Sequence, residues 1–128
     1  MVESIKKKVL LVDDDVDLLD STSRFITNSG YNVITAQNGK LAIEQFVKNN
    51  PDLTIMDVKM PVMDGYDAFF QIKEKSKDAR IILMTGYGND PRLAKAKSCC
   101  LTYLLEKPVK PSFLIELIKR HITKFPSC

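Results

Sequence analysis

Short apolar runs alternate along the chain with stretches in which apolar residues recur at helical spacing. The apolar runs predict five strands, at residues 8–12, 31–36, 53–56, 80–84 and 101–105. The periodic stretches predict five helices, at residues 16–29, 40–49, 66–75, 91–98 and from residue 111 onward. Strands that alternate with helices form a parallel sheet covered on both faces. The pattern therefore predicts an α/β fold.

Composition narrows this to one domain. The chain has 128 residues, of which 45% are hydrophobic, and no linker or low-complexity tract interrupts the pattern. We therefore expect a single domain over residues 1–128, with a core at about residues 8–124 and no visible output domain. No apolar run is long enough to span a bilayer, and the first residues lack the apolar stretch of a signal peptide.

Cysteine usage and charge bear on compartment and partners. The three cysteines have no CxxC spacing, which argues against a disulfide framework or a zinc site and favours a reducing, cytoplasmic setting. The net charge of +3 is mild and its charges are scattered, which is typical of a solvated surface. We therefore expect neither direct DNA binding nor membrane binding by this domain.

Polar side chains follow four of the five predicted strands. Asp13 and Asp14 come after the first strand, Asp57 after the third, Thr85 after the fourth and Lys107 after the fifth. Parallel sheets bind ligands outside the carboxyl ends of their strands. These side chains are therefore expected to meet at one edge of the sheet.

The residue types at this edge suggest a chemistry. Three converging carboxylates repel one another unless a cation lies among them, and Mg²⁺ prefers oxygen ligands. No histidine or cysteine stands near them in the sequence, which argues against zinc or copper. A cation, the Lys107 ammonium and the Thr85 hydroxyl around one aspartate would suit a transferring phosphoryl group, with the aspartate as nucleophile.

Four segments carry a family resemblance. LLVDDD, DLTIMDVKMPVMDG, ILMTGYG and LLEKPV, in this order and spacing, resemble the motifs of two-component response-regulator receiver domains from Val9 to about Ile122. The resemblance implies a flavodoxin-like, doubly wound (βα)5 fold with strand order 2-1-3-4-5. It also implies a phosphoacceptor signalling switch rather than an enzyme. Such a switch takes a phosphoryl group from a sensor histidine kinase or phosphotransfer protein, catalyses its own loading and hydrolysis, and changes its affinity for a downstream protein.

The resemblance also assigns roles around the metal. It implies that Asp57 is the phospho-acceptor and a metal ligand, that Asp14 is a direct ligand, and that Asp13 acts through water. The backbone carbonyl of Lys59 would be a further ligand. The metal would be Mg²⁺, for which Mn²⁺ can substitute.

The remaining assignments concern the switch. Thr85 matches the switch hydroxyl, and Lys107 matches the family's lysine, which precedes a cis bond to Pro108. The family usually has an aromatic residue three positions before that lysine, where this chain has Leu104. Tyr103 is one residue early and is expected to point to the opposite face of the sheet.

This departure shapes the expected output. Leu104 would respond only weakly to a movement of Thr85. We therefore expect the conformational change on phosphorylation to pass to a partner through residues 85–88 and the helix at 91–98. A partner would read that helix together with the fifth strand and the last helix. A basic face there would favour an acidic partner, and its members are Arg92, Lys95, Lys97, Lys110 and Lys119.

Other interpretations remain open at this point. Asp13 and Asp14 can cap the first helix, although Asp15 is the best capping candidate, and Asp64 suits a turn or cap before Gly65. Asp13 also resembles the nucleophile of haloacid-dehalogenase-type phosphohydrolases. A degenerate interaction module without phosphorylation is the third alternative.

Overall fold

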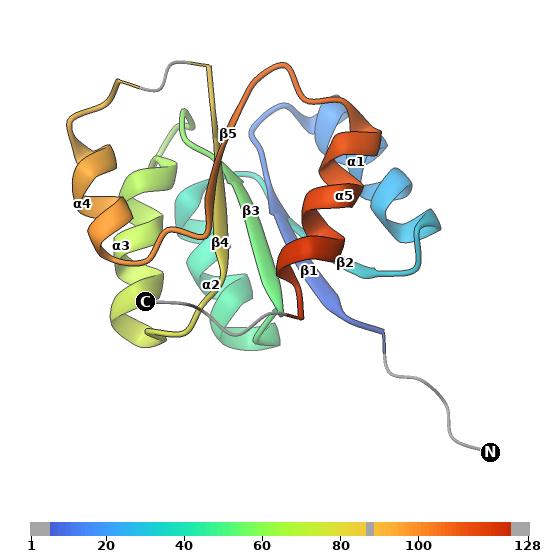
Figure 1. Ribbon diagram of the computed structural model, residues 1–128, viewed down its shortest axis with the longest axis horizontal. Helices are drawn as coiled ribbons and strands as arrows, with labels where there is room; N and C mark the ends of the chain where they lie inside the picture. The colour runs from blue at the N-terminus through green and yellow to red at the C-terminus, as the bar shows by residue number, and fades with distance from the viewer. Residues whose placement is uncertain (1–5, 87–88, 124–128) are drawn as a thin grey trace.

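Five parallel strands form one sheet in the order β2-β1-β3-β4-β5 (Figure 1). The computed structural model describes residues 6–86 and 89–123. The strands are β1 (Lys8–Val12), β2 (Asn32–Ala36), β3 (Leu53–Asp57), β4 (Ile81–Thr85) and β5 (Tyr103–Glu106). The helices are α1 (Val16–Asn28), α2 (Gly39–Asn49), α3 (Gly65–Lys75), α4 (Arg92–Ser98) and α5 (Pro111–His121). The predicted fold class and strand order are confirmed.

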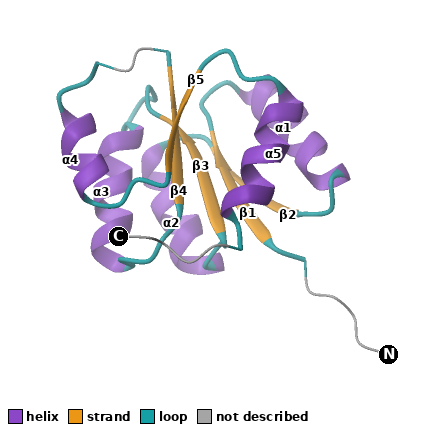
Figure 2. Cartoon of the chain, viewed as in Figure 1, coloured by secondary structure: helices purple, strands orange, loops and turns teal. Residues whose placement is uncertain are grey.

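Helices cover both faces of the sheet (Figure 2). The core on one face joins α2, α3 and α4 to the sheet through residues such as Phe46, Phe69 and Ala96. The core on the other face joins α1 and α5 through residues such as Ile26 and Ile118. The central strands β3 and β4 are buried along their whole length, as continuous apolar strands of a parallel sheet must be.

Element boundaries lie within two residues of the sequence prediction, and local hydrogen bonds account for two of the differences. Helix α2 begins at Gly39, because the Asn38 side chain accepts a hydrogen bond from the Leu41 amide at 2.9 Å and caps the helix. Strand β5 begins at Tyr103 because the Thr102 hydroxyl oxygen accepts the hydrogen bond of the Ile81 amide at 2.9 Å. Asp15 caps α1 through the Leu18 amide at 3.1 Å, as expected.

The two neighbouring cysteines that follow α4 differ in chemical state. Cys99 is a free thiol, whereas Cys100 is disulfide-bonded, so the argument against disulfides is wrong at Cys100. Spacing along a chain does not show which thiols the fold brings together. Within residues 6–86 and 89–123, no helix is long and apolar enough to cross a bilayer.

Gly65 holds the start of α3 directly against the end of β3. Its amide donates to the Val58 carbonyl at 2.8 Å, and an added Cβ would meet the Asp57 carbonyl oxygen and lie 2.8 Å from the Val58 Cα. Because these obstacles are backbone atoms, they can yield only if the backbone at Asp57 and Val58 moves. We expect Gly65→Ala to lower the free energy of unfolding by about 2–3 kcal/mol, measured by urea denaturation. Gly86→Ala is the control, since no described atom lies within 4 Å of its added Cβ; equal stability of the two variants would contradict this account.

Candidate functional site

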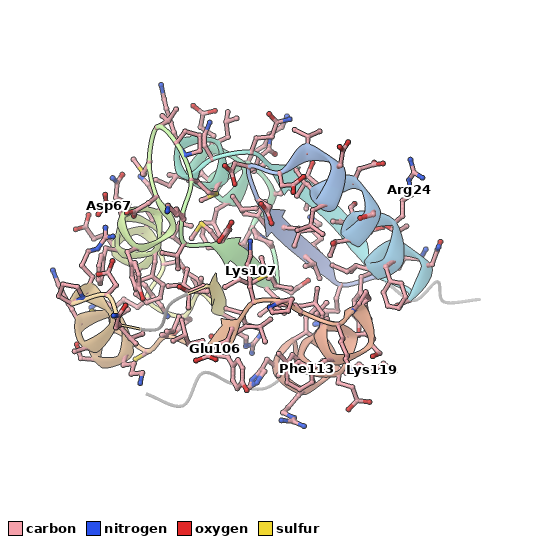
Figure 3. All side chains as sticks on the ribbon, turned by 90° about the horizontal axis from the view of Figure 1, so that it is seen from above. Arg24, Asp67, Glu106, Lys107, Phe113 and Lys119 are labelled. Atoms are coloured by element: carbon pink, nitrogen blue, oxygen red, sulfur yellow. The ribbon has the colours of Figure 1, made fainter. Side chains whose placement is uncertain are left out.

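The polar residues predicted from the strand ends do meet at one edge of the sheet. Asp13 follows β1, Asp57 ends β3, Thr85 ends β4 and Lys107 follows β5. This edge is the upper one in Figure 1. In Figure 3, which looks down on it, Lys107 lies near the middle of the molecule, whereas Arg24 and Lys119 point outward.

Three carboxylates cluster at this edge. Asp13, Asp14 and Asp57 each offer an oxygen, and these oxygens all lie within 4.8 Å of one another. Asp13 is 3% exposed and Asp57 is 6% exposed, whereas Asp14 faces solvent. The Asp15 amide fixes Asp13 by donating to its Oδ1 at 3.0 Å. An all-oxygen donor set, buried on one side and open on the other, fits a hard divalent cation that keeps some of its waters.

Lys107 compensates part of this negative charge. Its Nζ lies 2.9 Å from Oδ2 of Asp57 and 3.6 Å from Oδ2 of Asp13. Burial lowers the pKa of Lys107, but its hydrogen bond and attraction to Asp57, with the charge of Asp13, outweigh burial and raise that pKa. The lysine therefore stays protonated beside Asp57. The peptide bond to Pro108 is cis, as the resemblance implied.

A cavity of about 710 Å³ opens beside Asp57. Thr85, which is 5% exposed, and Lys107 both line it. The exposed Lys59, two residues beyond Asp57, lines it as well. The space is thus bounded by a carboxylate, a hydroxyl-bearing residue and two lysines, which suits an incoming phosphoryl group.

We expect the buried carboxylate of Asp13 to lower the stability of the folded protein when it is ionised. Burial is the main cause that raises its pKa, and it outweighs the Asp15 amide and Lys107, which lower it. A raised pKa in the folded state means that stability is lost as pH rises from the unfolded pKa through the folded one. At neutral pH the ionised Asp13 therefore destabilises the metal-free protein.

Asp13→Asn keeps the acceptor for the Asp15 amide and removes the charge. We expect the metal-free variant to be about 1 kcal/mol more stable than the wild type at pH 7. The difference should disappear below about pH 4, where the wild-type carboxyl is neutral in both states. Urea denaturation across this pH range checks it, with the exposed Asp20→Asn as the control; a less stable Asp13→Asn at pH 7 would refute the argument.

Sequence reasoning missed an ionic cluster at the rim of the cavity. Asp64 caps α3 through the Asp67 amide at 3.0 Å, as expected, but it also binds Arg92 at 2.8 Å. Arg92 contacts Asp67 at 3.3 Å and Asp90 at 3.0 Å as well. No local pattern links positions 28 residues apart. The assignment of Arg92 to a basic face is therefore wrong, because its charge is already neutralised.

Leu104 and Tyr103 lie on opposite faces, as predicted. Leu104 packs against the core beneath α2, α3 and α4. The Tyr103 ring lies 5.9 Å from the ring of His121 in α5. No aromatic side chain of β5 therefore lies on the face beneath α4. Residues 87–88 of the predicted output loop lie outside the described residues.

Comparison with known proteins decides the family. Residues 9–119 match the response regulator receiver domain family. The chain is a response-regulator receiver domain. It is 32% identical over 115 residues to the chemotaxis protein CheY of Thermotoga maritima, covering 89% of this chain and 96% of CheY. The CheX–CheY–BeF3–Mg complex from Borrelia burgdorferi contains a similar chain, with a TM-score of 0.84 and 27% identity over 94% of this chain and 92% of that one.

Another relative is longer. The receiver domain is 34% identical over 114 residues to the transcriptional regulatory protein PrrA of Mycobacterium tuberculosis, covering 88% of this chain but 47% of PrrA. The chain thus spans about half the length of PrrA.

Membership of the family settles the class of function. A receiver domain is a phosphoacceptor signalling switch of a two-component system, and its role is signalling rather than enzymatic. Such domains interact with histidine kinases or phosphotransfer proteins and with downstream targets. The haloacid-dehalogenase alternative is wrong, and a module that is never phosphorylated is not supported.

Proposed function

We propose that Asp57 is the residue of this receiver domain that accepts the phosphoryl group. The observation that carries this is the Lys107 ammonium, 2.9 Å from Oδ2 of Asp57 within a cluster of carboxylates. This contact supports the proposal, because the ammonium can compensate negative charge that is added at Asp57. Asp13 is more enclosed, and the Asp15 amide donates to its Oδ1 at 3.0 Å, so its carboxylate is less accessible to an incoming phosphorus atom.

The proposed chemistry is transfer from a phosphohistidine. An oxygen of Asp57 attacks phosphorus, the bond from phosphorus to the histidine nitrogen breaks, and the nitrogen takes up a proton. Lys107 attracts the developing charge on the phosphoryl oxygens, and Thr85 offers its hydroxyl to them. Water later attacks phosphorus, the acyl phosphate breaks, and inorganic phosphate leaves. The domain thereby catalyses its own loading and hydrolysis.

The carboxylate cluster is the proposed Mg²⁺ site, for which Mn²⁺ can substitute. Asp14 and Asp57 would bind directly, Asp13 through water, and Lys59 through its backbone carbonyl. When bound, the ion supplies charge neutralisation between the carboxylates and the phosphoryl oxygens. The similar CheY chain from Borrelia burgdorferi is described in complex with Mg and BeF3, which supports this proposal.

Partners and boundaries complete the proposal. The phosphoryl donor is a histidine kinase or phosphotransfer protein in the cytoplasm, and residues 1–128 act as one domain with a core at about 8–124. The downstream protein reads α4, β5 and α5. Exposed lysines on or next to these elements support an acidic partner surface, and they are Lys95, Lys97, Lys110 and Lys119.

Acetyl phosphate tests the proposal without the cognate kinase. Incubation with acetyl phosphate and MgCl2 should add one phosphoryl group, seen by intact mass, and peptide mapping should place it on Asp57. EDTA should prevent loading, and MnCl2 should restore it. Phosphate on Asp13, or loading that is unaffected by EDTA, would overturn the assignment.

A further inference from the structure

The start of α4 is tied to the start of α3 at the rim of the phosphoryl cavity. Asp64, Asp90 and Arg92 line the same cavity as Asp57 and Thr85. This junction therefore lies between the phosphoryl cavity and α4.

The Arg92 side chain makes five polar contacts at this junction. Its Nε and Nη2 bind the two oxygens of Asp90 at 3.1 and 3.0 Å. Its Nη2 and Nη1 also bind the two oxygens of Asp64 at 2.8 and 3.1 Å. A further contact from Nη1 reaches Asp67 at 3.3 Å. Five contacts to three carboxylates use the whole guanidinium fork, and the three to Asp64 and Asp67 tie the start of α4 to the start of α3.

Tyr66 lies directly beneath this arginine. Its ring is 4.8 Å from the Arg92 guanidinium carbon, and the residue is 0% exposed. Among the described residues, its hydroxyl has no hydrogen-bond partner. Burial raises the pKa of Tyr66. Asp90 is held close to this ring by Arg92, whose Nη2 binds Asp90 at 3.0 Å. A buried hydroxyl without an acceptor is unfavourable, so any arrangement that supplies one gains free energy.

We propose that Arg92 and Tyr66 form a two-position switch that couples the phosphoryl site to α4. The proposal rests on phosphorylation of Asp57. In the position described here, Asp90 is bound by Arg92 and the Tyr66 hydroxyl is unpaired. In the phosphorylated position, Asp90 leaves Arg92 and accepts a hydrogen bond from Tyr66.

Each position leaves a different group to be compensated. The first leaves the Tyr66 hydroxyl buried and unpaired. The second leaves Arg92 without Asp90, but Arg92 is 36% exposed and water can solvate its free N–H groups. Two arrangements of comparable free energy make a bistable element, which a phosphoryl group can bias. In this proposal Tyr66 provides the aromatic component of the switch, which the smaller Leu104 cannot provide.

The two residues are therefore expected to act in opposite directions on binding of a phosphoryl mimic. The test titrates BeF3⁻, which stands in for the phosphoryl group on Asp57, into the protein with saturating MgCl2. Arg92→Ala, which releases the resting position, should bind BeF3⁻ about tenfold more tightly than the wild type. Tyr66→Phe, which removes the hydroxyl that favours the other position, should bind it about fivefold more weakly.

Matched controls separate this from a loss of structure. Arg24→Ala breaks an exposed ion pair with Asp20 on α1, and Tyr103→Phe removes the hydroxyl of an exposed tyrosine in β5. Both should bind BeF3⁻ as the wild type does. Arg92→Lys keeps the charge without the fork and should fall between Arg92→Ala and the wild type. In the wild type, the side-chain resonances of Tyr66 should shift when BeF3⁻ binds.

The outcomes are distinct. Opposite signs for Arg92→Ala and Tyr66→Phe support the switch, because simple destabilisation would weaken BeF3⁻ binding in both. Equal affinities, or changes of the same sign, overturn it while leaving the proposed function intact. A wild-type protein that does not bind BeF3⁻ at all would refute the proposed function, and the switch with it.

Discussion

Asp57→Asn should abolish phosphorylation by acetyl phosphate. The amide is a far weaker nucleophile than the carboxylate and cannot form the acyl phosphate, so incorporation should fall at least about a hundredfold, to the detection limit. Phosphoryl incorporation measured by intact mass, under saturating MgCl2, checks this result. The neutral amide fits the same space, so a folded variant is expected.

The control for this experiment is another aspartate at the surface. Asp20 lies on α1 and pairs with Arg24 at 2.7 Å, away from the carboxylate cluster. Asp20→Asn should load at the wild-type rate. If Asp57→Asn retains half of the wild-type incorporation, a different residue is the acceptor.

Lys107→Met should slow loading by about 10²–10³-fold without removing the nucleophile. The ammonium is the described cation in contact with Asp57, and removing a preorganised charge of this kind typically has an effect of that size. Rates of loading by acetyl phosphate measure it, with Lys119→Met as the control, because Lys119 points away from the site in Figure 3. A rate within twofold of the wild type would remove Lys107 from the mechanism.

The same substitution should change the dependence of stability on pH. The pKa of Lys107 is raised in the folded protein, so its contribution to stability is complete below the unfolded pKa of about 10.4 and is lost as pH rises through the folded value. Lys107→Met should therefore be less stable than the wild type at pH 7 without metal, with a gap that narrows only above about pH 10.4. Mg²⁺ should restore part of the lost stability, since it neutralises the same carboxylates. A constant gap up to pH 11 would contradict this.

Part of this molecule could be predicted from the sequence because the information is local or repeats along the chain. The apolar run Lys8–Val12 and its successors predict buried strands, since a strand covered on both faces needs apolar side chains at every position. Alternation with helices then requires a parallel sheet. Because parallel strands end at one edge, the approach of Asp13, Asp57 and Lys107 also followed from sequence order alone.

Tertiary structure decided the features that depend on contacts between distant segments. No local pattern shows that Arg92 reaches Asp64 across the α3–α4 junction, or that the hydroxyl of Tyr66 lies buried beneath it. In the sequence, Arg92 is one basic residue among several on α4, and its neutralisation appears only when three carboxylates surround it. The later start of β5 likewise depends on a contact across 21 residues, in which the Thr102 hydroxyl accepts a hydrogen bond from the Ile81 amide. Local sequence sets where strands and helices form, whereas pairing of charges and hydrogen-bonding groups depends on which surfaces the packed core brings together.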